Sequence, residues 1–414
     1  MTGLLATPEK STRRNVLVDL RGLETDGSNG GLQTYVSWLL PWLVRHHREK
    51  FAFLALARFQ NIEFAASILG DEDAVWIESN SDVALQAPGS GQPAIATGSW
   101  SVEFAISSLG IDTIYSPLGP LPCTPPDGVH SVALVADMLH AEMPMCLDHS
   151  IVQQRSRYIT HIARHASLIQ CISHSSESKF LQHFPSAAGR TFFSYLPVHK
   201  RFERVEPDHA VTLETSNARP YFLYPANFWP HKNHLGLIVG YHQYVRKQGN
   251  TAWDLVLTGA DYNGGLERAR ETAASLGLGD RIRFVGYVTD DALEAIWKKA
   301  GALVFPSLHE GFGIPLIEAM HHRIPILTAP SYSLIEIAGP AALYFNPMKP
   351  EQIASRMNEL STSPSLADQL RQRGVERLAR FSDMSEVTSV VTALMGERPK
   401  RSSSELQDVC GCPV

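Results

Sequence analysis

The stretch from Ala302 to Met320, ALVFPSLHEGFGIPLIEAM, decides the fold. Its first part is a short apolar run typical of a buried strand, and its last part has the spacing of a helix that begins at a proline. The turn between them is bracketed by Gly311 and Gly313, so a ligand can approach the backbone where free N–H groups point outward. Glu310 and Glu318 flank this turn, which indicates a binding site as well as a change of direction.

The bulk composition predicts a folded protein of two domains. The chain has 414 residues, of which 44% are hydrophobic and 19% are charged. A formal net charge of -6 argues against general nucleic-acid binding. No window approaches the roughly 18 apolar residues of a membrane span, and the first residues lack the apolar run of a signal peptide, so we expect a cytoplasmic location. The five cysteines lack metal-type spacing and are interpreted as reduced structural thiols.

Short apolar runs alternate with helical segments in both halves of the chain, which is typical of βα units around parallel sheets. We therefore predict an α/β protein with two doubly wound, Rossmann-like domains that face each other across a cleft.

The segment from Ala87 to Ala96 is rich in Pro and Gly and is predicted to be a surface loop. Asp291 and Glu294 have capping-box spacing at the start of one helix. The predicted organisation is an N-terminal domain over 1–197, a linker over 198–220, a C-terminal domain over 221–382, a helix over 383–399 that packs back on the N-terminal domain, and a disordered tail over 400–414.

Two places in the N-terminal half are candidates for binding or catalysis. Gly30 and Gly31 lie in a Gly-rich loop between a strand and a helix, where backbone N–H groups can cradle a phosphate or a sugar; a simple tight turn is the alternative. Asp137 and His140 follow a buried strand and are expected to project into the cleft. Either side chain could orient or deprotonate a hydroxyl group. A capping aspartate and a packed histidine are the alternatives.

In the C-terminal half, Lys232 stands where a helix follows the first strand. Its ammonium group and the helix N-terminus could together hold a diphosphate, although a solvated surface lysine has the same sequence appearance. The preceding Trp-Pro-His turn would fix the direction of this lysine. Tyr287 and Val288 end a later strand, where backbone groups could bind a base edge; an ordinary strand end is the alternative. The carboxylate of Glu318 could accept hydrogen bonds from vicinal ribose hydroxyls, and Glu310 is better placed near a sugar. The alternative is that both acids only stabilise the start of the helix.

Together these stretches resemble the retaining nucleotide-sugar glycosyltransferases of family four, the group 1 glycosyltransferases, which have the GT-B fold. The resemblance covers most of the chain and is strongest from Tyr221 to Pro347. The segment from Glu310 to Glu318 matches the family's two-glutamate motif, with seven residues between the acids. Other positions that fall where the family has corresponding features are Gly30, Gly31, Asp137, Ser173, Lys232, Gly286, Tyr287 and the run 330–336.

The resemblance implies that the N-terminal domain binds the acceptor and that the C-terminal domain binds the nucleotide sugar. Lys232 would hold the diphosphate, Glu318 the ribose, and Glu310 the donor sugar. Gly30 and Gly31 would form the loop near the phosphate and the acceptor. The remaining donor-binding positions are Asn227, Tyr287, Val288, Gly311, Phe312, Gly313 and Ile314, and the catalytic set is Asp137, His140, Lys232 and Glu310.

Two departures from the family pattern affect this assignment. Ala136 stands where many relatives have a histidine that contacts the donor sugar, and His140 is the candidate to replace it. Asn227 stands where many relatives have an arginine five residues before the lysine. Arg155 or Arg157 could supply the missing cation.

The implied activity is the transfer of a hexose, with retention, from a nucleotide-diphosphate sugar to a hydroxyl of a glycan or lipid-linked sugar in cell-surface polysaccharide or lipopolysaccharide biosynthesis. No metal or cofactor is expected, since Asp71 and Asp73 lie in a predicted loop and not at a strand end. The expected partners are the donor, the acceptor and the inner membrane as a peripheral contact. Two alternatives are a catalytically silent nucleotide-sugar-binding subunit, favoured by Ala136 and Asn227, and a sugar-nucleotide epimerase on the same fold.

Overall fold

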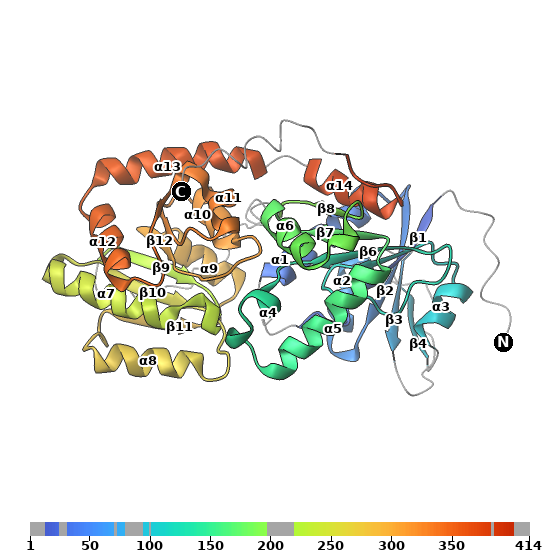
Figure 1. The fold of residues 1–414 in the computed structure, drawn as a ribbon, viewed down its shortest axis with the longest axis horizontal. Helices are drawn as coiled ribbons and strands as arrows, with labels where there is room; N and C mark the ends of the chain where they lie inside the picture. The colour runs from blue at the N-terminus through green and yellow to red at the C-terminus, as the bar shows by residue number, and fades with distance from the viewer. Residues whose placement is uncertain are drawn as a thin grey trace.

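The computed structural model contains two α/β domains side by side (Figure 1). Its described residues are 13–24, 31–69, 73–78, 94–98, 101–196, 219–381 and 385–400. Gly30, nearly all of the predicted linker and the tail from residue 401 lie outside these ranges. The predicted fold class is confirmed, because each domain is built on a wholly parallel sheet with helical crossovers.

The N-terminal sheet has eight strands within the described residues, in the order β4-β3-β2-β1-β5-β6-β7-β8. The strand order reverses direction beside β1, so the carboxyl end of β1 is a topological switch point. The strands are β1 (Arg14–Asp19), β2 (Phe51–Ala57), β3 (Ala74–Glu78), β4 (Ala94–Gly98), β5 (Thr113–Ser116), β6 (His130–Val135), β7 (Leu168–Cys171) and β8 (Thr191–Phe193). Their helices are α1 (Gly31–His46), α2 (Ile62–Ile68), α3 (Val102–Ser108), α4 (Leu139–Glu142), α5 (His149–His165) and α6 (His174–His183).

The C-terminal sheet has six strands in the order β11-β10-β9-β12-β13-β14 in the described part of the chain. Its switch point lies between β9 and β12, which are neighbours in space although β10 and β11 separate them in sequence. The strands are β9 (Tyr221–Pro225), β10 (Asp254–Thr258), β11 (Ile282–Gly286), β12 (Ala302–Phe305), β13 (Ile326–Thr328) and β14 (Ala342–Tyr344). The helices are α7 (His234–Gln248), α8 (Gly265–Ser275), α9 (Asp290–Trp297), α10 (Ile314–His321), α11 (Tyr332–Ala338), α12 (Pro350–Ser361), α13 (Pro364–Leu378) and α14 (Ser385–Leu394).

Two local predictions are wrong. The last three residues of the segment predicted as a loop, Ala94 to Ala96, belong to β4, which pairs in parallel with β3, and residues 87–93 lie outside the described residues. The prolines and glycines of the predicted loop all precede Ala94, and pairing with β3, which is a tertiary effect, makes the residues from Ala94 a strand. Helix α9 is capped by Thr289, whose hydroxyl accepts the N–H of Ala292 at 3.4 Å, and not by Asp291.

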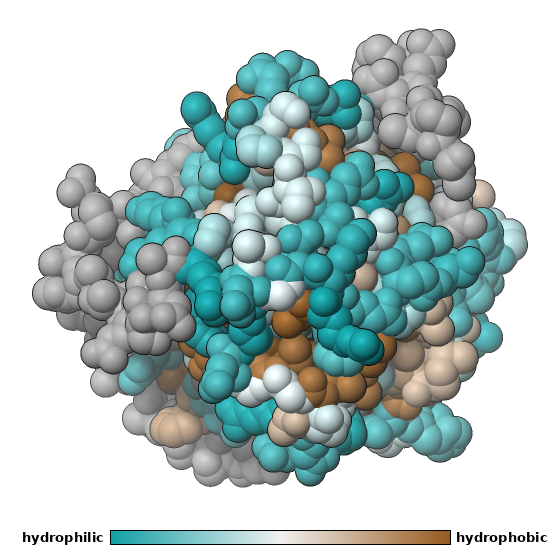
Figure 2. All heavy atoms as spheres, turned by 90° about the vertical axis from the view of Figure 1, so that its left-hand side faces the viewer, coloured by the Kyte–Doolittle hydropathy of each residue, from teal (hydrophilic) through white to brown (hydrophobic). Residues whose placement is uncertain are grey.

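Helix α14 lies against the N-terminal sheet, far from the C-terminal sheet that precedes it in sequence (Figure 1). The carboxylate of Glu386 accepts the N–H of Tyr195 at 2.9 Å, and the carbonyl of Leu394 accepts the Thr113 hydroxyl at 3.1 Å. The end of the molecule formed by the C-terminal domain is mostly hydrophilic, with apolar side chains gathered in its lower middle (Figure 2).

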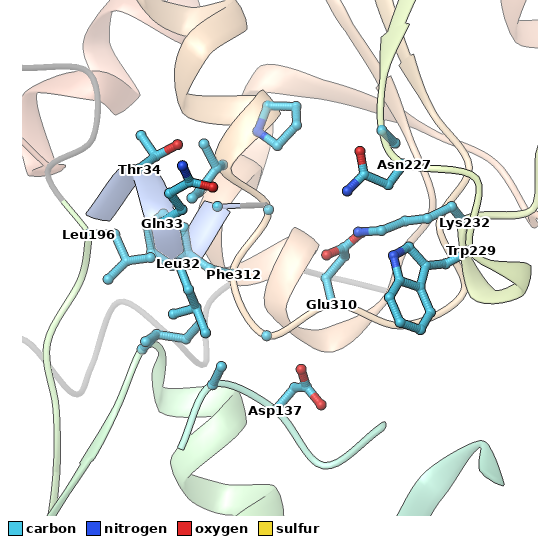
Figure 3. A pocket seen from close by; sticks show the side chains of 18 of the residues that line it. Leu32, Gln33, Thr34, Asp137, Leu196, Asn227, Trp229, Lys232, Glu310 and Phe312 are labelled. Atoms are coloured by element: carbon cyan, nitrogen blue, oxygen red, sulfur yellow. The ribbon is translucent and has the colours of Figure 1, made fainter. Parts of the chain in front are cut away.

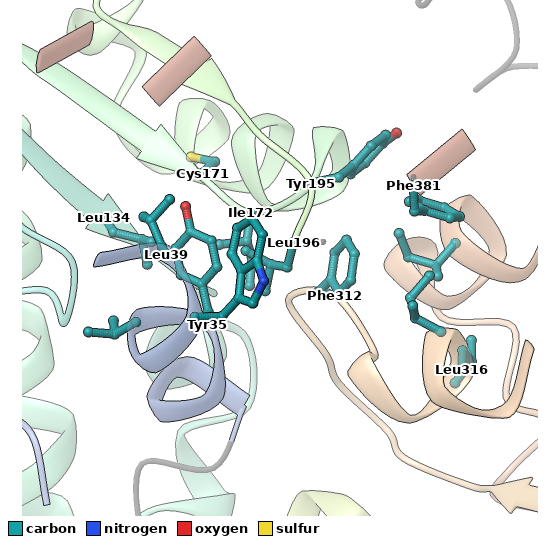
Figure 4. Close-up of a cluster of buried hydrophobic side chains, with 14 of the residues drawn as sticks. Tyr35, Leu39, Leu134, Cys171, Ile172, Tyr195, Leu196, Phe312, Leu316 and Phe381 are labelled. Carbon is teal, nitrogen blue, oxygen red and sulfur yellow. The ribbon is translucent and has the colours of Figure 1, made fainter. Parts of the chain in front are cut away.

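The two domains touch through an apolar contact that contains the Gly-rich turn (Figure 4). Phe312 is 2% exposed and packs beside Tyr195 and Phe381, with ring centroids 6.1 and 6.2 Å away. A Cβ on Gly311 would lie 2.0 Å from the carbonyl oxygen of Ala136, so only glycine permits this approach. The turn is therefore part of the domain contact as well as of the cleft.

A buried carboxylate also joins the domains. Glu336, in α11, accepts the backbone N–H groups of His174 and Ser175 at 2.8 Å each and the Ser175 hydroxyl at 2.5 Å. These donors form the N-terminus of α6, where a negative charge is favourable. Ser173 adds a hydrogen bond from its hydroxyl to the carbonyl of Gly311, at 2.6 Å.

Replacing Glu336 by Ala should loosen this domain contact, because three donors at a helix N-terminus lose their acceptor. We expect the free energy of unfolding to fall by about 2–3 kcal/mol and amide exchange at His174 and Ser175 to accelerate. Chemical unfolding and hydrogen exchange measure the two effects. Glu271→Ala, on the exposed face of α8, is the control; unchanged exchange at His174 and Ser175 in Glu336→Ala would contradict the assignment.

Candidate active site

A cleft of about 880 Å³ lies between the domains and opens at the carboxyl ends of both sheets. Its C-terminal wall is formed by the segments after β9, β10, β11 and β12 together with the start of α10. Its N-terminal wall is formed by the start of α1, the end of β6, and α5. The sequence-predicted residues that line it are Gly31, Asp137, Asn227, Lys232, Tyr287, Val288, Glu310, Gly311, Phe312, Gly313, Ile314 and Glu318.

Lys232 is positioned by a short 3-10 turn, Pro230–Lys232, between β9 and α7. The Tyr224 hydroxyl donates to the Lys232 carbonyl at 2.7 Å, and the Leu308 N–H donates to the His231 carbonyl at 2.8 Å. Asn233 follows in the left-handed conformation, with φ of 58°, which turns the chain into α7. These bonds hold the backbone, so the lysine side chain extends into the cleft from a fixed base.

The ammonium of Lys232 donates to the Glu310 carboxylate across 2.6 Å (Figure 3). The two side chains are 19% and 12% exposed, so water screens this ion pair less than it would on an open surface. Glu310 comes from the loop after β12, and Lys232 from the loop after the neighbouring strand β9. The adjacent strands thus bring together two groups that lie 78 positions apart in the sequence.

The turn after Glu310 presents the N-terminus of α10 to the cleft. Gly313 has a φ of 101°, which favours glycine, and Gly313, Ile314 and Pro315 all line the cavity. Glu318, one turn into α10, is 3% exposed and also lines the cleft. Two carboxylates and a lysine therefore surround one helix start, where free N–H groups attract anions.

On the opposite wall, Asp137 accepts hydrogen bonds from Arg155 at 2.6 Å and from the Leu139 N–H at 2.8 Å. Burial acts to raise the pKa of Asp137, but Arg155 and then His309 lower it, and the net pKa lies well below its usual value. Asp137 is therefore ionised near neutral pH and can accept a hydrogen bond from a hydroxyl, but it is a poor general acid.

His140 is placed differently from its sequence-based assignment. It is 5% exposed and does not appear among the described residues that line the cleft. Burial, and then Arg155, lowers its pKa to about 4, so its imidazole is neutral near pH 7. We therefore assign His140 no substrate contact, because it lies behind the wall that Asp137 forms.

Two further predicted positions have structural partners. The side-chain oxygen of Asn227 accepts the Ala260 N–H at 2.8 Å, which ties the loops after β9 and β10 together. A Cβ on Gly31 would meet Ile314 at 2.3 Å, so the start of α1 lies directly against the start of α10. Gly30, the other predicted glycine, falls outside the described residues.

Some polar contacts between the two domains were not predicted from the sequence. His309 faces Glu142 across the domains at 3.5 Å, and Asp148 accepts hydrogen bonds from Tyr262 at 3.1 Å and Asn263 at 2.7 Å. Asp148 stands directly before α5, so its helix-capping position was the available signal. No signal in the sequence predicts that Asp148 pairs with the other domain, because contacts between domains have no local sequence signature.

His231 also lines the cleft and is 8% exposed. Burial, and then the ammonium of Lys232, lowers its pKa to about 2. It is therefore a neutral neighbour that does not add to the positive charge of Lys232. Across the described residues, no group of three or more His, Cys, Asp or Glu side chains is arranged to hold a metal ion.

The fold and part of the sequence match known proteins. Residues 207–377 match the family model for glycosyl transferases group 1. Two solved structures cover nearly the whole chain. Sucrose-phosphate synthase from Thermosynechococcus elongatus matches with a TM-score of 0.63 and 15% identity, over 93% of this chain and 98% of that one. Anabaena HepE in complex with UDP matches with a TM-score of 0.62 and 14% identity, over 92% of this chain and 99% of that one. At these identities the structures show the fold alone.

Curated relatives found by sequence match part of this chain. O-antigen chain mannosyltransferase B of Escherichia coli is 27% identical over 232 residues, 55% of this chain and 60% of that protein. O-antigen chain mannosyltransferase RfbU of Salmonella typhimurium is 31% identical over 156 residues, 37% of this chain and 41% of that protein. The matched region thus spans less than two thirds of either relative.

The fold is the two-domain GT-B fold, as in the solved structures that match this chain. The sequence match to the group 1 glycosyltransferases is carried by residues 207–377, which include most of the C-terminal domain. The family resemblance predicted from the two-glutamate motif is confirmed. Where the structure describes the chain, none of its helices has the length and apolar character needed to span a membrane.

The buried histidine at the start of α7 should make stability pH-dependent. Burial, and then Lys232, lowers the pKa of His234 to about 3, below the 6.5 of an ordinary histidine. The unfolded chain then binds the proton first, so stability is full above about pH 6.5 and falls as the pH drops toward 3. We expect His234→Gln to reduce the slope of unfolding free energy against pH by up to about 1.4 kcal/mol per unit.

Urea unfolding between pH 7 and pH 5 measures this slope for the wild type and His234→Gln. His165→Gln, at the exposed end of α5, is the matched control for replacing a histidine. Equal slopes for the wild type and His234→Gln would show that His234 is protonated in the folded protein.

Proposed function

We propose that this protein is a retaining, metal-independent glycosyltransferase. It transfers a hexose from a nucleotide-diphosphate sugar to a hydroxyl of a glycan or lipid-linked sugar, in cell-surface polysaccharide assembly. Two relatives by sequence are O-antigen mannosyltransferases, which makes a mannosyl donor the first candidate. Contact with the membrane surface, where lipid-linked acceptors reside, is part of the proposal.

One observation carries the proposal: Lys232, Glu310 and Glu318 surround the N-terminus of α10 at a topological switch point. A diphosphate suits the lysine and the helix N–H groups, which favour negative charge. Vicinal ribose hydroxyls suit the buried carboxylate of Glu318. This leaves Glu310, between the two, for the hydroxyls of the donor sugar.

The chemistry then needs mainly charge stabilisation at the leaving group. As the bond between the sugar C1 and the diphosphate oxygen breaks, Lys232 and the α10 N–H groups stabilise the charge that develops on the phosphate. The acceptor oxygen bonds to C1 on the same face, and its proton passes to the leaving phosphate oxygen. Asp137, held ionised beside Arg155, orients the acceptor hydroxyl by accepting a hydrogen bond.

A panel of UDP-, GDP- and dTDP-hexoses, beginning with GDP-mannose, tests the activity with and without EDTA. We expect nucleotide release from one donor at a rate that EDTA does not change. Lys232→Gln should lower kcat about 10²- to 10³-fold, as loss of an oxyanion-type donor does. Nucleoside diphosphate binding without transfer or hydrolysis would indicate the silent subunit instead, and a rate abolished by EDTA would contradict metal independence.

The ribose assignment of Glu318 is tested with ligands as well as mutations. The wild type should bind the preferred nucleoside diphosphate at least about tenfold more tightly than its 2′,3′-dideoxy analogue, since a buried carboxylate loses its donors. In Glu318→Ala both ligands should bind equally weakly. Calorimetry measures the four affinities, and persistent discrimination in Glu318→Ala would remove Glu318 from the ribose site.

A further inference from the structure

Both cations of fixed charge in the described cleft lining are already paired with carboxylates of the same lining. Among the described lining residues, four are carboxylates and two are cations of fixed charge. Arg155 is bonded to Asp137, and Lys232 is bonded to Glu310. His231, whose burial lowers its pKa to about 2, adds no charge. An anionic diphosphate that enters this cleft therefore meets its cations in ion pairs, and one pair must open.

The two pairs differ in how firmly the carboxylate is held. Asp137 accepts the Leu139 N–H as well as the Arg155 guanidinium, and both bonds lie within the N-terminal domain. The carboxylate of Glu310 has one hydrogen bond in the described structure, from Lys232. Lys232 also lies on the same domain as Glu318 and the α10 N-terminus. The Lys232–Glu310 pair is thus the weaker of the two and the nearer to the nucleotide.

The backbone around Glu310 is fixed, so only its side chain is free to respond. The Glu310 carbonyl accepts the Ser333 hydroxyl at 2.7 Å, and the next carbonyl, of Gly311, accepts the Ser173 hydroxyl at 2.6 Å. Gly311 itself is pressed against Ala136. Rotation about side-chain bonds, and not movement of the loop, is the available response.

We propose that the Lys232–Glu310 ion pair is an exchange switch. The donor diphosphate replaces the Glu310 carboxylate on Lys232, and the released carboxylate turns to accept hydrogen bonds from the donor sugar. This inference rests on the function proposed above. Glu310 is then a competitor of the diphosphate in the empty site and a ligand of the sugar in the occupied one.

The switch couples recognition of the two halves of the donor. A carboxylate held by Lys232 is a poorer acceptor for sugar hydroxyls, so the sugar contact forms only after the diphosphate has taken the lysine. By linkage, the sugar moiety then also strengthens diphosphate binding by the same factor. Free sugar alone gains little from this site.

Calorimetric titration of the full chain with UDP and with GDP tests the switch. Glu310→Gln has nearly the same shape but cannot form the ion pair, so it should bind the preferred diphosphate about tenfold more tightly than the wild type, while its transfer rate falls. Asp290→Asn is the matched control, because it removes one negative charge from the same cleft and leaves the Lys232–Glu310 pair in place. Glu310→Ala, with no side-chain amide, should show the same gain in affinity.

The outcomes separate the switch from the proposed function. Binding by Glu310→Gln and Glu310→Ala that is no tighter than wild type overturns the switch, and so does an equal gain in Asp290→Asn, which would indicate general charge repulsion. In the Lys232→Gln background, Glu310→Gln should no longer increase the affinity for the diphosphate. An undiminished increase in affinity also overturns the switch. Failure of the wild type to bind either diphosphate would instead contradict the proposed function.

Discussion

The parallel pairing of β9 with β12 is the constraint on which the site depends. The register sets Phe222 beside Ala302 and Leu223 beside Leu303, all of them completely or almost completely buried. Successive residues face opposite sides of the sheet and all four are buried, so both faces are packed, and a shift of one residue would exchange the side chains that pack on each face. Both strands then end at the same level, and their loops deliver Lys232 and Glu310 to one point.

The two walls of the cleft have different chemistry. The C-terminal wall concentrates the lysine, two glutamates and a helix start, whereas the N-terminal wall is largely apolar around one aspartate–arginine pair. The apolar residues of that wall include Leu118, Leu139, Leu147, Ile159 and Leu196. The polar wall suits a charged nucleotide, which must be held through many directed bonds. The apolar wall suits contact through shape, which specifies fewer individual groups of a bound molecule than directed hydrogen bonds do.

The domain contact makes the site a product of both halves. Gly311 lies on the Ala136 carbonyl, and Ser173 bonds to the turn that carries Glu310. Glu336 holds the start of α6 from the other domain. Movement of one domain therefore alters the position of the turn from Glu310 to Gly313 directly. Such contact also excludes water, which strengthens every charge interaction in the cleft.

The sequence by itself determined the fold class, the family resemblance and a set of residues that line the cleft, because strand periodicity, glycine turns and the Glu310–Glu318 spacing are local patterns. It did not predict the pairing of β4 or the burial of His140 outside the described cleft lining, since sheet-edge pairing and burial depend on distant neighbours. Only the tertiary structure decided that Lys232 bonds to Glu310 and Asp137 to Arg155. Ion pairs depend on distances between groups far apart in the chain, and no local spacing encodes those distances.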